Sequence, residues 1–117
     1  KYGTGKKADA LGYSVGGKTG TAEKINQNGK YSKTEKIVTF TGGFPMNAPR
    51  FAITIMIDNP KGQKFSNNYA TAGWVVAPVV KKFVNRVAPI LKINPLTKNE
   101  MTKLNNLKEY KIRGAEL

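Results

Sequence analysis

Cysteine and histidine are both missing from this sequence of 117 residues. Without cysteine the chain cannot form disulfide bonds, and without either residue it lacks the usual ligands of a structural zinc site. A Ser-His-Asp triad and a Cys-His pair are excluded for the same reason. Any chemistry that the chain supports therefore depends on Ser, Thr, Lys, Tyr or carboxylate side chains. We expect neither a metal nor a cofactor.

Acidic residues are also scarce, because seven Asp and Glu stand against 20 Lys and Arg, a net charge of +13. Such a charge attracts anionic partners, nucleic acid above all. However, 17 of the 20 basic residues are Lys, and they are spread along the whole chain. Base readout favours clusters led by Arg, with aromatic residues between them. We interpret the charge as a solvated surface, with no nucleic-acid partner, and keep a basic nucleic-acid-binding module as an alternative.

Long hydrophobic runs are absent as well. The most apolar stretches, residues 53–57 and 74–80, fall short of the roughly 18 apolar residues that a membrane span requires. No signal segment is recognisable, and the chain opens on Lys1 rather than on an initiator Met. Although the length allows one domain, these features lead us to expect a piece of a longer polypeptide.

The residues that are present predict three strands. β-Branched and aromatic residues with turn signals between them indicate strands at 13–25, 36–41 and 51–58. Asn28-Gly29 predicts a hairpin turn after the first strand, and we expect an exposed connection at 31–35. Gly42-Gly43 is expected to end the second strand. The nearly continuous apolar run of the third strand predicts burial on both faces.

The hydrophobic spacing changes from two to about 3.6 residues after Ala70, which predicts a helix. Its expected apolar face comprises Val76, Val80, Phe83, Val84, Val87 and Leu91. Pro78 should kink this helix, and Pro89 should end or bend it. A weaker pattern after Pro95 predicts a short solvated helix near residues 98–111. The chain is therefore expected to be α+β, with a helix on one face of an antiparallel sheet.

Residues 12–19 match the phosphate-binding motif G-x-x-x-x-G-K-[ST] letter for letter. A P-loop needs a buried strand before it and a helix after it, whose N-terminus faces the phosphate. Polar residues precede this stretch and Gly20 follows it directly, so neither neighbour is predicted. A nucleotide-binding loop is therefore the less favoured alternative.

The same stretch places Lys18-Thr19-Gly20-Thr21 on a predicted strand, and Lys-Thr-Gly is a signature of penicillin-binding proteins and β-lactamases. Further matching segments follow at 40–45, 49–53, 57–60 and 72–79. In these segments the chain resembles the C-terminal part of a class B penicillin-binding protein, most closely a division-specific, septal transpeptidase. The resemblance implies that residues 1–95 form part of a transpeptidase domain and that 96–117 are a tail. It also implies the last three strands of a five-stranded antiparallel sheet and the final helix that packs on it.

The resemblance assigns roles to the four residues of the motif. Lys18 would be the catalytic cation, next to the substrate carboxylate and the catalytic hydroxyls. Thr19 and Thr21 would offer hydroxyls to that carboxylate, and the Thr21 amide would point at the oxyanion. Gly20 would let the substrate backbone approach the strand. An extended peptide could then add alongside this edge strand.

The implied activity is that of a serine D,D-transpeptidase, which cross-links peptidoglycan stem peptides and is acylated by β-lactams that mimic their D-Ala-D-Ala ends. The implied partners are those stem peptides, β-lactams, the N-terminal part of the same polypeptide and proteins of cell division and cell-wall synthesis. The implied location is the periplasmic side of the bacterial inner membrane.

The chain departs from this family pattern in one respect, because it contains no S-x-x-K motif. Ser66-Asn67-Asn68 fits the S-x-N signature but follows the Lys-Thr-Gly strand, so we interpret it as a loop with a helix N-cap. The chain is therefore expected to be inactive alone.

The missing part of the domain also matters for folding. Without the two upstream strands, strand 51–58 keeps an unpaired edge. We expect stability only with the rest of the domain, by self-association, or as a cleaved chain held in the whole.

Five other residues have a structural and a functional interpretation. Trp74 is expected to pack the start of the helix against the sheet rather than to stack on a ligand. Glu23 and Asp58 are expected to be solvated or salt-bridged rather than paired for catalysis. Tyr13 and Tyr31 fit a half-buried sheet face and the lining of a cleft equally well.

Overall fold

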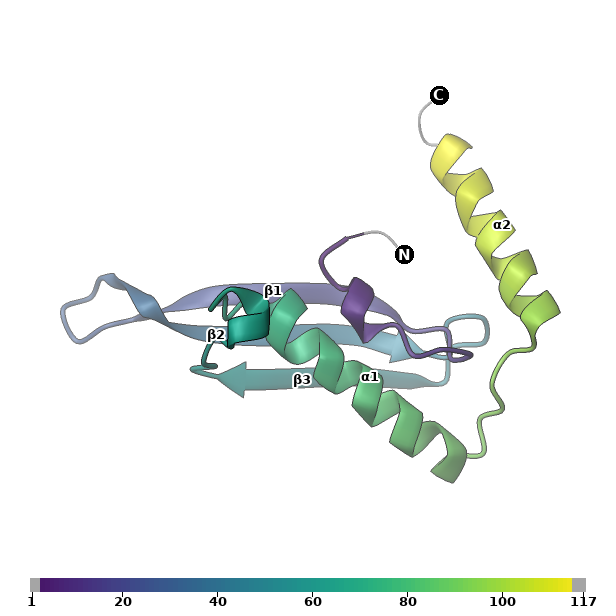
Figure 1. Cartoon of the computed structure of the whole chain (residues 1–117), viewed down its shortest axis with the longest axis horizontal. Helices are drawn as coiled ribbons and strands as arrows, with labels where there is room; N and C mark the ends of the chain where they lie inside the picture. The colour runs from purple at the N-terminus through teal and green to yellow at the C-terminus, as the bar shows by residue number, and fades with distance from the viewer. Residues whose placement is uncertain (1–2, 115–117) are drawn as a thin grey trace.

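The computed structural model describes the backbone of residues 3–114 and the side chains of residues 3–107. Within these residues lie a three-stranded antiparallel sheet, two short 3-10 turns and two α-helices (Figure 1). The elements are η1 (Lys6–Ala8), β1 (Gly16–Ile25), β2 (Tyr31–Phe44), β3 (Phe51–Asp58), η2 (Lys64–Ser66), α1 (Ala72–Ile90) and α2 (Lys98–Gly114). The predicted α+β class is confirmed.

The strands follow one another in the order β1-β2-β3, and both neighbouring pairs are antiparallel. The predicted turn between β1 and β2 is confirmed. The Asn26 side-chain oxygen accepts hydrogen bonds from the amides of Asn28 and Lys30, each at 3.0 Å. Gly29 adopts a positive φ of 73°, which glycine tolerates without steric cost. Local side-chain chemistry therefore fixes this hairpin.

Strand β2 is longer than predicted at both ends. Residues 31–35, expected to be a connection, form its first part, and Tyr31 is paired with Ile25 of β1. Gly42 and Gly43 continue the strand because they pair with β1 on one side and with β3 on the other. Two ladders of backbone partners therefore outweigh the weak strand preference of glycine.

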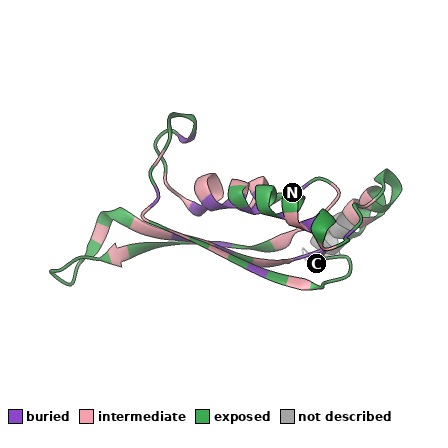
Figure 2. Ribbon diagram, turned by 90° about the horizontal axis from the view of Figure 1, so that it is seen from below, coloured by how far each residue is buried: buried purple, intermediate pink, exposed green. Residues whose placement is uncertain are grey.

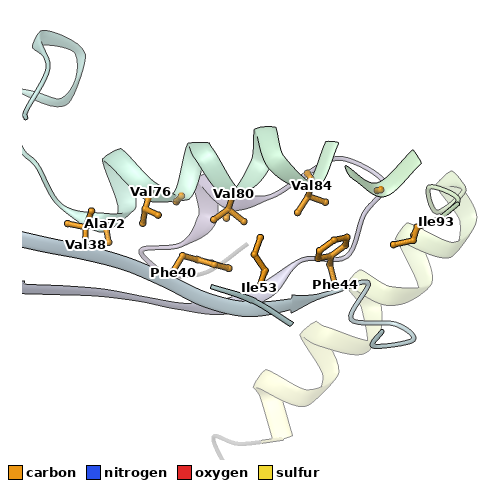
Figure 3. Packing of buried hydrophobic residues seen from close by; sticks show 13 residues of the cluster. Val38, Phe40, Phe44, Ile53, Ala72, Val76, Val80, Val84 and Ile93 are labelled. Atoms are coloured by element: carbon orange, nitrogen blue, oxygen red, sulfur yellow. The ribbon is translucent and has the colours of Figure 1, made fainter. Parts of the chain in front are cut away.

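Helix α1 covers one face of the sheet (Figures 1 and 2). Five of its six buried residues recur every four positions, namely Ala72, Val76, Val80, Val84 and Ala88, and Ala77 is buried beside them. They pack on Val38, Phe40, Phe44 and Ile53 of the strands (Figure 3). Burying one such valine fully contributes about 1.5–3 kcal/mol. Phe83 was wrongly assigned to the buried face, since it lies beside this stripe and is 41% exposed.

The other face of the sheet is uncovered in the part of the chain that the structure describes (Figure 2). Strand β3 therefore alternates between the two faces, with Ile53 buried and both Thr54 and Met56 exposed. The predicted burial of β3 on both faces is wrong for this chain, because no second layer covers it.

The helices otherwise follow the sequence pattern. Helix α1 continues through Pro78 and ends at Ile90, directly after Pro89. The predicted tail helix is confirmed and extends to Gly114. Among residues 3–114, no helix combines the length and the apolar character needed to cross a membrane.

Candidate functional site

The Lys-Thr-Gly-Thr motif lies on β1, which is an edge strand of the sheet. Successive side chains of a strand point to opposite faces. Thr19 pairs with Phe40 of the core and is 8% exposed, so Thr19 and Thr21 belong to the face that α1 covers. Lys18 and Gly20 belong to the uncovered face. The motif therefore divides its side chains between the two faces of the sheet.

Lys18 is exposed, and its Nζ donates a hydrogen bond to the Thr19 carbonyl oxygen at 2.9 Å. Thr41 of β2 lies directly opposite Lys18, and Thr54 of β3 donates to the Thr41 hydroxyl at 3.3 Å. A cation and two hydroxyls thus share the uncovered face. Neither threonine was predicted from the sequence, although the hairpin register places Thr41 opposite Lys18.

The two threonines of the motif already have partners. Thr19 Oγ1 lies 2.6 Å from Thr4 Oγ1, and Thr21 Oγ1 accepts a hydrogen bond from the Ala72 amide at 3.1 Å. A hydroxyl that accepts a hydrogen bond keeps its own proton to donate. Thr21 can therefore bind the first turn of α1 and still donate to a carboxylate. Thr4 was missed, since Gly3-Thr4-Gly5 gives no stronger sequence signal than a polar loop.

Gly20 provides a flat point on the edge strand. A Cβ at this position would lie 2.6 Å from the Thr39 hydroxyl oxygen of the neighbouring strand. In the region that the structure describes, no strand pairs with the other edge of β1. An extended peptide could pair with this edge by main-chain hydrogen bonds.

The structure contradicts the phosphate-loop interpretation of residues 12–19. Lys18 and Thr19 are paired with β2 inside a sheet rather than placed at the start of a helix. The backbone amides of a P-loop must instead converge on a phosphate at a helix N-terminus. The nucleotide-binding alternative is therefore wrong.

The Ser66 side chain stabilises the local backbone between Gln63 and Tyr69. Its hydroxyl is buried, lies 2.9 Å from both the Gln63 and the Tyr69 carbonyl oxygens, and accepts a hydrogen bond from the Gln63 amide at 3.1 Å. Asn67 and Asn68 form the predicted loop, whereas Ser66 is the last residue of η2. The N-cap residue of α1 is Thr71 and not a residue of the Ser-Asn-Asn triplet.

The two carboxylates considered from the sequence do not form a pair. Asp58 binds Lys24 at 3.0 Å, while Glu23 lies opposite Lys36 on β2. The salt-bridged interpretation is thus confirmed for Asp58. These groups lie near the hairpin end of the sheet, several residues from Lys18 along β1.

The aromatic residues considered as ligand contacts are Trp74, Tyr13 and Tyr31, and two of them pack against other parts of the protein. Trp74 is half-buried, with Lys7 Nζ 3.0 Å from its ring centroid, so it contacts the N-terminal segment instead of joining the buried helix–sheet core. Tyr13 packs against that core, whereas Tyr31 is 70% exposed. Of the two tyrosines, Tyr13 lines the same cavity as Lys18 and Thr19, whereas Tyr31 pairs with Ile25 at the far end of β1.

Comparison with known proteins supports the resemblance. The family model of the penicillin binding protein transpeptidase domain matches residues 1–85. The chain is 39% identical over 100 residues, 81% of its length, to the probable peptidoglycan D,D-transpeptidase FtsI of Caulobacter vibrioides. It is 40% identical over 101 residues, 86% of its length, to the stage V sporulation protein D of Bacillus subtilis. The structure of penicillin binding protein 3 from Mycobacterium tuberculosis, complexed with ampicillin, matches 82% of the chain with a TM-score of 0.67 and 31% identity.

A helix-covered antiparallel sheet with Lys-Thr-Gly on its edge strand is typical of penicillin-binding proteins and β-lactamases. Within that class, the chain belongs to the penicillin binding protein transpeptidase domain family. The chain spans 17% of the Caulobacter relative, 15% of the Bacillus relative and 21% of the mycobacterial chain. The activity of those whole proteins is therefore assigned to this chain only as a proposal.

Proposed function

We propose that this chain is part of a serine D,D-transpeptidase that cross-links peptidoglycan stem peptides, and that it contributes the Lys-Thr-Gly-Thr wall of the active site. One observation carries the proposal: Lys18 and Gly20 lie on an open edge strand and on the face that α1 leaves uncovered. A substrate and a serine-bearing layer both have access to that position. The names of the relatives support the reaction class.

The reaction has two acyl transfers. A serine outside this chain attacks the carbonyl carbon of the penultimate D-Ala, the bond to the terminal D-Ala breaks, and that residue leaves with a proton on its amine. An amine of a neighbouring stem peptide then attacks the resulting ester, which forms the cross-link and frees the serine. A β-lactam enters the first step and leaves the serine acylated.

The residues of β1 would support the first transfer. A substrate carboxylate at the open edge of β1 can be reached from both faces of the sheet. There the Lys18 ammonium would attract it from one face, and the Thr21 hydroxyl would have a proton to donate to it from the other. The Thr21 amide would stabilise the developing oxyanion. Because the sequence contains no S-x-x-K motif, the chain alone is inactive in this proposal. The longer polypeptide would act at the periplasmic face of the inner membrane, with proteins of cell division.

Fluorescent penicillin tests this proposal. The polypeptide that carries this sequence together with the serine-bearing part of the domain should be acylated, and the isolated 117-residue chain should not. Lys18→Ala should lower the second-order rate constant of acylation about 10- to 100-fold, because a hydrogen bond between charged groups is worth about 1.5–3 kcal/mol.

Lys24→Ala is the matched control, because Lys24 lies on the same strand but binds Asp58. Its acylation rate should stay within about twofold of the unmodified protein. Equal losses for the two lysines, or labelling of the isolated chain, would contradict the proposal.

A further inference from the structure

The first turn of α1 contacts both threonines of the motif, one directly and the other through Thr4. The Ala72 amide donates a hydrogen bond to Thr21 Oγ1 at 3.1 Å. Thr4 Oγ1 lies 2.6 Å from Thr19 Oγ1, and a Cβ on Gly73 would lie only 2.6 Å from the Thr4 carbonyl oxygen. Glycine at position 73 therefore lets the helix approach the segment that holds the Thr19 side chain.

The segment that carries Thr4 is packed against the helix and the sheet. Lys7 Nζ lies 3.0 Å from the centroid of the Trp74 ring, which is a cation–π contact between this segment and α1. Ala8 and Ala10 are 3% and 1% exposed and belong to the hydrophobic core. The Thr4 hydroxyl is therefore in place beside Thr19 before any ligand arrives.

The Thr4–Thr19 pair has one proton more than its mutual hydrogen bond needs. A threonine hydroxyl has one proton to donate and two lone pairs that accept. When Thr4 donates to Thr19, the Thr19 proton remains for a further acceptor. Thr19 lines the same cavity as Lys18, so an anionic group that Lys18 holds at the edge of β1 also lies next to Thr19.

The direction of the acyl donor in the proposed function agrees with this arrangement. The donor carboxylate is placed at Lys18, and the reacting carbonyl is placed at the Thr21 amide, further along β1. The acyl part continues from there toward the hairpin end of the strand, away from Thr4. Only the carboxylate end of the donor therefore comes close to the Thr4–Thr19 pair.

We propose that Thr4 is a positioning residue for the carboxylate of the acyl donor. Its hydroxyl donates to Thr19 Oγ1 and thereby directs the Thr19 proton to that carboxylate. Without this bond the Thr19 hydroxyl rotates freely, and its donation to the carboxylate is weaker. This inference rests on the proposed function, since it takes Lys18 as the group that attracts the carboxylate.

Thr4→Val in the serine-containing polypeptide removes the hydroxyl and keeps a side chain of nearly the same shape. It should lower the second-order rate constant of acylation by benzylpenicillin about 3- to 10-fold, the range of a net hydrogen bond between neutral groups. Thr4→Ser keeps the hydroxyl and should stay within about twofold of the unmodified protein. Thr102→Val is the matched control, because the Thr102 hydroxyl donates to the Lys98 carbonyl oxygen within α2, and its acylation rate should not change.

Two comparisons separate positioning from a general loosening of the segment. The loss in Thr4→Val/Thr19→Val should equal that in Thr19→Val alone, because Thr4 acts only through Thr19. Thr4→Val should change acylation by benzylpenicillin methyl ester less than about twofold, since the ester lacks the charged carboxylate. Multiplied losses in the double variant, equal losses with the acid and the ester, or a slow Thr4→Ser variant would overturn the inference.

If benzylpenicillin does not acylate the unmodified polypeptide, the proposed function is wrong, and Thr4 is tested by ligand binding. Methyl NMR would then follow Thr19 during titration with N-acetyl-D-Ala-D-Ala and with the C-terminal amide of the same peptide. A Thr19 shift with the acid alone, together with weaker binding of the acid to Thr4→Val, supports the positioning role. No shift with the acid, an equal shift with the amide, or equal affinity of the two proteins overturns it.

Discussion

Four glycines bring β1 and β2 together next to Lys18, where Gly16 pairs with Gly43 and Gly17 pairs with Gly42. They are not equivalent in their surroundings. A Cβ on Gly42 would collide with the Gly16 carbonyl oxygen and lie 2.8 Å from Gly17 Cα. A Cβ on Gly16 would instead approach the flexible Met46 side chain, at 2.9 Å. A methyl group at Gly42 would therefore meet backbone atoms of β1, which cannot rotate away as a side chain can.

Gly42→Ala should lower the free energy of unfolding by about 1–3 kcal/mol, because backbone atoms must separate to make room for the methyl group. Gly16→Ala should cost less than about 1 kcal/mol, since a side chain can rotate away and the unfolded chain loses freedom. Urea unfolding of the serine-containing polypeptide measures both changes. Equal losses for the two variants would show that the backbone contact is unimportant.

At the scale of elements, α2 owes its start to a capping box. The Thr97 amide donates to Glu100 Oε2 at 2.8 Å, and the Glu100 amide donates to Thr97 Oγ1 at 3.3 Å. These reciprocal bonds satisfy orphan amides of the first turn. The hydrogen bonds from the Thr97 amide and hydroxyl hold the pKa of Glu100 below its ordinary value of 4.5. The beginning of the tail helix is therefore sensitive to acid.

A carboxyl with a lowered pKa stabilises the folded state fully above its unfolded pKa and loses that contribution as the pH falls through the folded pKa. The start of α2 should thus fray below about pH 4.5. The Met101 ¹³Cα chemical shift should move toward its unfolded value over this range, and Glu100→Gln should remove that titration. A shift that titrates identically in Glu100→Gln would exclude the capping box as its cause.

At the scale of the whole molecule, the sheet has an uncovered face and an unpaired outer edge within residues 3–114 (Figure 2). Helix α1 covers one face of the sheet, and β3 has no strand partner on its outer edge within residues 3–114 (Figure 2). Ile53, Ile55 and Ile57 of this strand all contribute to the core face. An unpaired apolar edge strand is a template for pairing with another chain.

The isolated 117-residue chain should therefore self-associate, and light scattering after size exclusion should give masses above the monomer that rise with concentration. Met56→Lys should reduce this association, because it places a charge on the exposed face of the edge strand, where Met56 is 64% exposed. Met46→Lys is the control, since Met46 lies in the loop between β2 and β3. A concentration-independent monomer would contradict the prediction.

Local patterns in the sequence determined much of this protein. Alternating β-branched residues and Asn28-Gly29 predicted the hairpin, and valines at helical spacing predicted the helix. The motif at Lys18 and the segments around it predicted the family. These features depend on short sequence motifs or on residues that are close together in the chain. They could therefore be recognised without knowledge of any long-range contact.

The tertiary structure alone decided what each face meets. Periodicity predicts that a strand has two faces, but it does not say whether a second layer covers β3. The partners of the motif threonines, Thr4 and the Ala72 amide, lie 15 and 51 residues away in the sequence. The Gly12 carbonyl oxygen likewise accepts a hydrogen bond from the Leu96 amide across more than 80 positions. Such contacts follow from packing, which brings together residues that no local pattern connects.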